Sequence, residues 1–248
     1  MAEIPSVWLC RLALAVQPVP EPFDFQAWPD QMWMLVGTVD SGRRQLIRTI
    51  AGLSPPQSGR VELFGQPAER LWPRANARLR RRIGVVLEQA GLAPAWSVFE
   101  NLALLVRYHG LAPASDVERE RYVVEFVEIC RVPLTLLSRL AGDLSPLESS
   151  WVGLLRALII RPELLLVSGY LPRETLVADY GVWRFFEEVV QPMRMTILVD
   201  AGPQALPIHP ESRLLVMDQG TLLAAGLASE LRDHPDERVQ RYARADHA

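Results

Sequence analysis

Two glycines separated by four residues, Gly37 and Gly42, mark the segment of this 248-residue chain that most clearly suggests chemistry. A glycine, four residues, a second glycine, a lysine and then a serine or threonine form a loop whose backbone N–H groups cradle phosphates. Both glycines are present here, but Arg43 occupies the lysine position and Arg44 the hydroxyl position. The chain contains no lysine, since its 26 basic residues are all arginine. The spacing therefore predicts a phosphate-binding loop that has lost two of its chemical side chains.

Each replacement in this loop changes what the loop can bind. Arginine keeps the positive charge of lysine, but it is a wide planar fork rather than a compact ammonium group. Arg44 removes the hydroxyl that would reach a magnesium ion and adds a cation in its place. Asp40, inside the loop, would repel a phosphate. One alternative stays open, because the N–H groups of Ser41 and Gly42 at a helix N-terminus, with the two arginines, could still hold an anion.

The segments on either side supply the strand and the helix that such a loop requires. Residues 32–36 form an apolar run that ends at Gly37, as a buried strand does. Residues 43–53 carry apolar side chains on one face of a helical period, which predicts a helix. Strand, glycine loop and helix is the context that a phosphate-loop match needs.

The rest of the chain alternates between predicted strands and predicted helices. Strands are expected at residues 6–16, 23–36, 60–65, 83–87, 164–167, 196–199 and 213–217. Residues from about 97 to 160 are mostly helical, and the tail after Glu230 is predicted as a polar, frayed helix. This alternation favours a mostly parallel α/β sheet with an inserted helical subdomain. We therefore expect one domain over residues 1–230 and a polar tail over residues 231–248.

Composition and charge exclude several classes of protein. A net charge of -3 and a pI near 5.9 give no reason to expect a nucleic-acid partner. The apolar stretches are shorter than the roughly 18 residues of a membrane span, and Glu3 stands where a secretory signal carries positive charge. Cys10 and Cys130 lie in apolar surroundings and are expected to be buried thiols in a reducing compartment. We expect a cytoplasmic protein without a metal site.

Six segments in a fixed order resemble the ATP-binding subunit of ABC transporters, over roughly residues 6–230. They are similar to the family's SGKSTLLRxIAGL loop, its SGxVxxxG strand, the strand before its Q-loop, its TVxENV segment, its ARAL…PELLLLDEP stretch and its VMDQG turn. In the same order, the six segments of this chain are residues 41–53, 58–65, 83–88, 98–102, 155–166 and 216–220. The resemblance implies an α/β P-loop NTPase fold of the ABC type, with a mostly parallel sheet core, an antiparallel β subdomain and an inserted helical subdomain.

The resemblance fails at the positions where the family does its chemistry. The aspartate and glutamate that end the Walker B strand align with Ser168 and Gly169. Their loss removes support for the magnesium ion and a general base whose effect is typically about 10²–10⁴-fold. The Q-loop position holds Glu88, with Gln89 beside it, and the switch histidine position holds Ala201 or Gly202. No catalytic residue is therefore expected.

The family's signature LSGGQ is also altered. It aligns with Leu144, Ser145, Pro146, Leu147 and Glu148. Proline has no N–H to donate, leucine blocks close approach, and Glu148 adds negative charge where phosphate should lie. The resemblance thus implies that both halves of the nucleotide site are damaged, so no cofactor is expected, and ATP with magnesium only if the degenerate site still binds.

The resemblance implies a degenerate subunit that docks on an integral-membrane permease at the cytoplasmic face of the inner membrane, with ATP hydrolysis lost or severely impaired. Trp96, Val98, Phe99 and Leu102, in the segment after the Q-loop, are expected to contact the permease. This segment is similar to subunits of MCE-type lipid transport systems, so an MCE protein could belong to the complex. The dimer is expected to be a homodimer or a heterodimer with another ABC ATPase.

Two alternatives stay open from the sequence. The chain could be a nucleotide- or anion-binding regulatory subunit of a heterodimeric ABC transporter, or a slow residual ATPase that uses Glu88 or an unrecognised base. We also expect one of the two loop arginines to pair with a carboxylate in the vacated pocket. The candidates are Asp40, Glu88 and Glu148.

Overall fold

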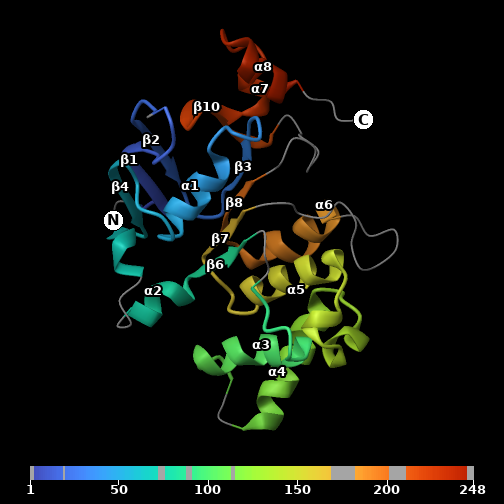
Figure 1. Ribbon diagram of the computed structural model, residues 1–248. Helices are drawn as coiled ribbons and strands as arrows, with labels where there is room; N and C mark the ends of the chain where they lie inside the picture. Colours follow the sequence, from blue (N-terminus) through green and yellow to red (C-terminus); the bar gives the residue numbers. More distant parts are fainter. Residues whose placement is uncertain are drawn as a thin grey trace.

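The computed structural model contains two β-sheets and a helical region (Figure 1). The described residues are 3–18, 20–71, 76–87, 91–112, 115–168, 182–200 and 211–244. Five residues named from the sequence, Glu88, Gln89, Gly169, Ala201 and Gly202, lie outside these ranges.

A six-stranded sheet forms the centre of the molecule. Its strands in spatial order are β10 (Thr221–Leu227), β9 (Arg213–Asp218), β3 (Met32–Val36), β8 (Thr196–Asp200), β7 (Leu164–Val167) and β6 (Ile83–Val86). Neighbouring strands from β9 to β6 are parallel, and β10 pairs antiparallel with β9. Every residue of β7 and β8 is buried, as the continuous apolar runs of a parallel sheet require. The predicted α/β fold with a mostly parallel core is confirmed.

A smaller antiparallel sheet packs beside it. Its strands in spatial order are β2 (Phe23–Ala27), β1 (Val7–Ala13), β4 (Ser58–Leu63) and β5 (Gln66–Pro67). The strand expected over residues 23–36 is divided into β2 and β3, because Asp30 takes a left-handed conformation with φ 62°. The strand expected over 60–65 ends at Leu63, because Phe64 and Gly65 turn the chain with φ of 52° and 73°.

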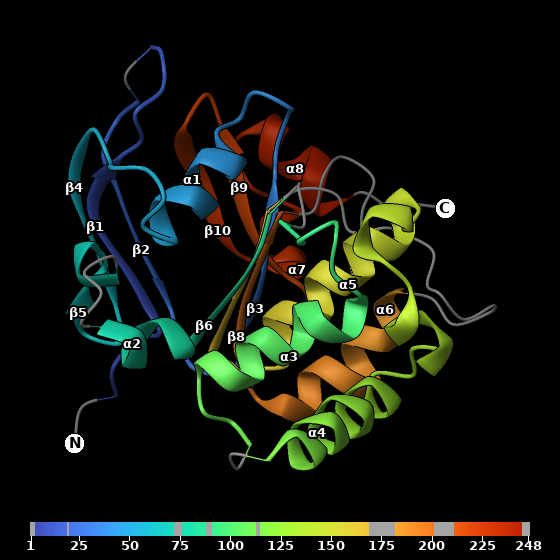
Figure 2. The same cartoon turned by 60° about the horizontal axis from the view of Figure 1, so that its bottom comes forward.

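Helix α1 (Arg43–Ile50) lies between the two sheets (Figure 2). Its side chains Leu46, Ile47 and Ile50 are fully buried against strands of both sheets. The short helix α2 (Ala77–Arg81) leads into β6. The loop before α1 is therefore carried by a helix that has apolar walls on both sides.

The opposite face of the parallel sheet is covered by helices. They are α3 (Val98–Tyr108), α4 (Asp116–Ile129), α5 (Pro146–Leu158) and α6 (Val182–Phe185), which continues as a π-helical turn (Phe186–Val190). Residues alternate between the two cores along β3: Met34 faces the helices, while Leu35 faces α1. Burial raises the pKa of the Cys130 thiol to about 12, in keeping with the buried thiol expected there, whereas Cys10 is only partly buried.

The segment after Glu230 contains a helix, as its sequence predicts, but this helix packs on the core instead of fraying. Helix α7 (Ala228–Leu231) starts where β9 begins, since the Ala228 N–H bonds the Ser212 carbonyl. Helix α8 (Glu237–Ala243) follows, and its Arg238 forms an ion pair with Asp218 at the end of β9. Val239 and Ala243 are buried in the main core. Two apolar positions four residues apart suffice to seat a short helix, which an average polarity conceals.

We expect replacement of Val239 by aspartate to lower the free energy of unfolding by about 3 kcal/mol, since a carboxylate would be buried without a partner. Arg241→Asp, on the exposed face of the same helix, should cost less than about 1 kcal/mol. Chemical denaturation measures both. Equal, small effects would mean that α8 does not pack on the core.

Candidate functional site

The loop between β3 and α1 is held against the turn between β9 and β10. The Gly220 N–H donates a hydrogen bond of 2.9 Å to the Ser41 carbonyl. A Cβ atom at Gly37 would lie 2.3 Å from the Met217 carbonyl oxygen, and one at Gly42 would lie 2.8 Å from the Gly220 Cα. Gly42 also has a φ of 90°. Packing alone therefore requires both loop glycines, whether or not a phosphate binds.

Arg43, at the lysine position of the loop, turns inward and forms a buried ion pair. Its Nη1 lies 2.8 Å from Oδ1 of Asp200, the last residue of β8. Its Nε donates a hydrogen bond of 3.1 Å to the Ser41 hydroxyl. The exposed fractions of the Arg43 and Asp200 side chains are 4% and 3%. The guanidinium that would meet a phosphate is thus engaged by a carboxylate of the same chain.

This partner differs from the carboxylates that we expected from the sequence. Glu148 bonds Arg139 instead, and Glu88 lies outside the described residues. Asp200 is available because β3 and β8 are neighbours, and their register sets it opposite Leu35. The signal was present in the sequence: an acid directly follows the strand predicted at 196–199, and the carboxyl ends of parallel strands share one edge of a sheet.

Charge at the start of α1 explains why an acid is needed there. A helix N-terminus carries positive partial charge, and Arg43 and Arg44 add two cations with no acidic residue in the first turn. Burial lowers the pKa of the Arg43 guanidinium, and the charge of Asp200 raises it. An arginine nevertheless stays protonated in proteins. The buried charge must therefore be balanced in place, and Asp200 balances it.

The signature-like segment forms the start of α5. Ser145 is the N-cap, with its hydroxyl 3.2 Å from the Glu148 N–H, and the Glu148 carboxylate accepts a 2.8 Å bond from the Ser145 N–H. Pro146 occupies the first helical position, where a missing N–H costs little. Leu144 and Leu147 are partly buried against the core. The segment thus satisfies its own helix terminus with an internal carboxylate.

The charge of Glu148 is further stabilised from outside the helix. Its hydrogen bonds with Ser145, the backbone bond first among them, lower the pKa of its carboxyl, and Arg139 lowers it further. The Arg139 guanidinium also donates a 2.8 Å bond to the Asp143 carbonyl. Glu148 is therefore ionised at neutral pH and remains committed to the helix cap.

Ser168 follows β7 directly and is buried. Its backbone N–H donates a 2.8 Å bond to the Val86 carbonyl, which extends the β6–β7 pairing by one residue. A serine hydroxyl carries no charge with which to hold a magnesium-bound water.

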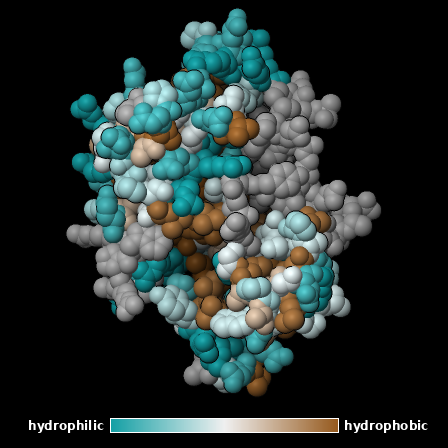
Figure 3. Space-filling model, in the orientation of Figure 1, coloured by the Kyte–Doolittle hydropathy of each residue, from teal (hydrophilic) through white to brown (hydrophobic). Residues whose placement is uncertain are grey.

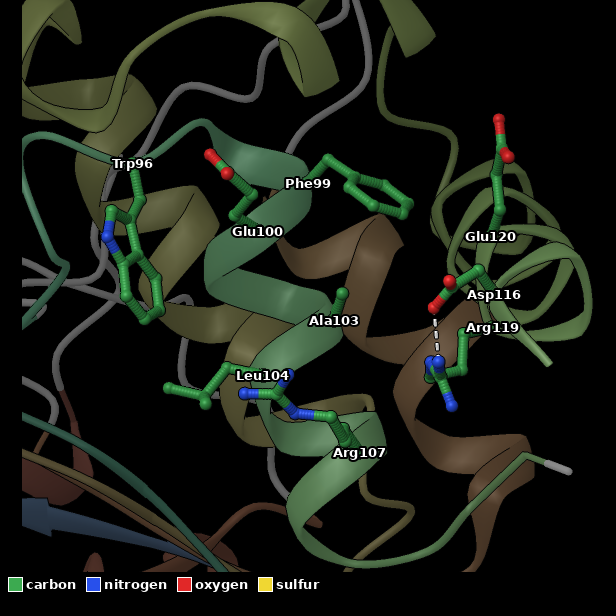
Figure 4. A pocket seen from close by; sticks show the side chains of 9 residues that line it. All are labelled: Trp96, Phe99, Glu100, Ala103, Leu104, Arg107, Asp116, Arg119 and Glu120. Atoms are coloured by element: carbon green, nitrogen blue, oxygen red, sulfur yellow. Dashed lines mark hydrogen bonds and ion pairs between the residues drawn. The ribbon is translucent and has the colours of Figure 1, made fainter. Parts of the chain in front are cut away.

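A groove of about 410 Å³ lies between α3 and α4 (Figure 4). Its lining residues are Trp96, Phe99, Glu100, Ala103, Leu104, Arg107, Asp116, Arg119 and Glu120. Trp96 and Leu104 lie toward the same side of α3 in Figure 4, with exposed fractions of 41% and 39%. We call this feature the α3–α4 groove. It combines exposed apolar side chains with charged residues of both signs.

Two of the four residues expected to face a permease do not reach this surface. Val98 and Leu102 are completely buried in the main core, whereas Trp96 and Phe99 line the α3–α4 groove. The difference is one of helical phase, since the surface side of α3 passes through residues 100, 103, 104 and 107 rather than 98 and 102. Sequence reasoning missed Leu104 for the same reason.

A second hollow lies between α2, β6, α3 and α5. Figure 3 shows apolar side chains gathered in a hollow near the middle of that face of the molecule. The apolar residues that line the second hollow are Ala51, Ile83, Val85, Leu105, Ala157 and Ile160. The remaining lining residues include Arg80, His109 and Arg156. Apolar surface therefore continues from α3 toward the core sheet.

Within the described residues, no group of three or more metal-ligating side chains comes together. In the same part of the chain, no helix is long and apolar enough to cross a membrane.

A parallel sheet whose central strand leads through a glycine loop into a buried helix is the architecture of P-loop nucleotide-binding proteins. The model of the ABC transporter family matches residues 21–167, and this chain therefore belongs to that family.

Curated relatives agree with this assignment. The Nod factor export ATP-binding protein I of Cupriavidus metallidurans is 29% identical over 87% of this chain and 68% of that protein. The Fe(3+) ions import ATP-binding protein FbpC of Streptomyces avermitilis is 30% identical over 84% of this chain and 58% of that protein. The methionine import ATP-binding protein MetN of Mesorhizobium japonicum is 28% identical over 77% of this chain and 52% of that protein. The chain thus spans about half to two thirds of the length of these relatives.

Solved structures share the fold at low sequence identity. An ATP-binding cassette solved as a dimer in a post-hydrolysis state with ADP and Pi superposes with a TM-score of 0.75 at 17% identity, over 89% of this chain and 98% of that one. The cbiO1 protein of Clostridium perfringens superposes with a TM-score of 0.71 at 16% identity, over 98% of this chain and 96% of that one. The ABC-type P-loop fold is therefore shown.

We expect Arg43→Met and Asp200→Leu each to lower the free energy of unfolding by about 3–5 kcal/mol, since each leaves one buried charge unbalanced. The double variant should lose less than either single variant, because no buried charge remains. The exposed Asp30–Arg194 pair is the control, and breaking it should cost less than about 1 kcal/mol. Purely additive losses in chemical denaturation would contradict a coupled pair.

Proposed function

We propose that this chain is a degenerate ABC transporter subunit that docks on an integral-membrane permease and has lost efficient ATP hydrolysis. The observation that carries the proposal is the buried ion pair between Arg43 and Asp200. In this reading the chain supports its permease as a structural partner, at the cytoplasmic face of the inner membrane and within a homodimer or a heterodimer.

The side chains around the loop do not fit ATP with magnesium. The guanidinium of Arg43 is already neutralised by Asp200, and Arg44 offers a cation where a magnesium ligand is needed. Ser168 and Pro146 replace a metal-supporting carboxylate and a phosphate-facing N–H, respectively. Each loss alone would slow hydrolysis; together they support a subunit without a nucleotide cycle.

The α3–α4 groove supports the docking role. A membrane permease can offer an amphipathic helix from a cytoplasmic loop, and such helices bind in grooves that have apolar anchor points. Trp96 and Leu104 are large apolar side chains held partly in solvent on a rigid helix. Tryptophan is among the residues that contribute most to binding energy at interfaces.

The names of the relatives span export of Nod factor and import of methionine and Fe(3+). Such breadth favours a subunit that serves a permease rather than one that selects a substrate itself. Within this range we propose a lipid transport system of the MCE type, with an MCE protein in the complex. The support is the segment from Gly91 to Asn101, which resembles that branch.

We expect the purified chain to hydrolyse ATP with magnesium at the background rate and to give no measurable heat of ATP binding in calorimetry. The reason is that the loop cation is already paired inside the protein. Arg43→Ala is the control that separates a contaminating ATPase from activity of the chain. Turnover at an ordinary transporter rate that Arg43→Ala abolishes would overturn the loss of hydrolysis.

We expect the chain to co-purify with the permease encoded beside its gene, and Trp96→Glu with Leu104→Glu to reduce the captured permease about tenfold or more. The matched control is Ile129→Glu, because Ile129 is exposed on α4 but does not line the groove. Undiminished capture by the double variant would exclude the groove as the docking surface.

A further inference from the structure

We propose that the Asp200 carboxylate is an internal substitute for a bound phosphate, and that Asp200 decides whether the loop of residues 37–42 accepts an external anion. The inference deepens the proposed function and rests on it in one respect, namely that the loop descends from a nucleotide site. It assigns the exclusion of anions to one residue outside the loop, rather than to the altered loop residues themselves.

Arg43 already uses N–H donors that an incoming phosphate would need. A guanidinium presents its N–H groups as a rigid fork that suits carboxylates and phosphates equally well. One arm, Nη1, is 2.8 Å from Asp200, and Nε bonds Ser41, which is itself completely buried. An incoming phosphate would seek the same donor, because Arg43 is the residue at the position of the phosphate-binding lysine.

The position of Asp200 is fixed by the pairing of β8 in the central sheet. Asp200 ends β8 and is in register with Leu35 of β3, two residues before Gly37. The carboxylate is therefore delivered to the loop by a central parallel strand that is buried along its whole length. A carboxylate on a mobile loop could swing aside for a ligand, whereas Asp200 is itself paired with Leu35 of β3, and the preceding Val199 is paired with Val167 of β7.

The charge of Asp200 opposes the binding of an external anion at this loop. An external anion would have to displace a buried carboxylate or sit beside it, and two negative charges that share a site repel strongly. Displacement would leave Asp200 buried without its cation, which is costly. Removing the charge of Asp200 reverses both effects, because Arg43, Arg44 and the N-terminus of α1 then form a cationic site.

The test compares Asp200→Asn with the wild-type chain, using inorganic pyrophosphate and calorimetry. Asparagine keeps the shape of aspartate and removes its charge. We expect no measurable pyrophosphate binding by the wild type. We expect Asp200→Asn to bind pyrophosphate with a Kd about tenfold to hundredfold below the weakest Kd that the calorimetry detects. The control is Asp30→Asn, which neutralises an exposed acid that pairs with Arg194 at the opposite end of β3.

A second readout covers a variant that folds poorly. If Asp200→Asn is largely unfolded, millimolar pyrophosphate should restore its cooperative melting, since a ligand that binds only the native state stabilises it. Asp200→Thr, a smaller neutral replacement, should behave in the same way. Pyrophosphate should leave the melting of Asp30→Asn unchanged.

The outcomes separate this inference from the proposed function. Pyrophosphate that binds the wild type as tightly as Asp200→Asn would overturn the inference. So would two neutral variants that neither bind pyrophosphate nor are stabilised by it. In the second case the wild-type chain would still lack ATP hydrolysis, so the proposed function would stand while Asp200 lost its assigned role.

Discussion

The charge of Arg43 is the constraint on which the rest of the site depends. An arginine cannot discard its proton when it is buried, so the chain must supply an anion wherever it encloses a guanidinium. Asp200 supplies that anion, and it does so at the edge where β3 and β8 end side by side. The same pair ties the start of α1 to the central sheet, so that the loop, the helix and the strand are one unit.

The packing around this pair does not depend on what the loop binds. Gly37 and Gly42 are required by their approach to Met217 and Gly220. The apolar face of α1 is buried between two sheets regardless of what the loop binds. Charges at two segments are paired within the chain, Arg43 with Asp200 at the loop and Glu148 with Arg139 at the start of α5. Neither the charge of Arg43 nor that of Glu148 therefore requires a bound ligand to balance it.

The sequence was sufficient for the fold class, because strands alternate with helices along the chain and six segments follow the family order. It was less informative wherever a decision depends on phase or on contacts between distant residues. Val98 and Leu102 share a motif with Trp96 and Phe99, yet helical phase buries the first two. The polarity of residues 231–248 concealed the two apolar positions that seat α8.

Asp200 was missed for a different reason. It stands one residue before the position at which a catalytic histidine was sought, and a search for family chemistry passes over a residue type that the family does not use there. Only the register between β8 and β3 brings it to Arg43. Such long-range partners are fixed by topology rather than by spacing along the chain.

Backbone contacts connect the α3–α4 groove to the signature-like segment. The Val98 N–H bonds the Arg139 carbonyl at 2.9 Å, and the Ala141 N–H bonds the Trp96 carbonyl at 2.9 Å. Arg139 in turn holds Glu148 at the start of α5. In a subunit that binds and releases nucleotide, movement at the start of α5 would reach a docked partner through these contacts. In the proposed subunit the start of α5 is fixed by an internal carboxylate, so the same contacts would hold Trp96 in one position. Such a surface suits a partner that must be held in place.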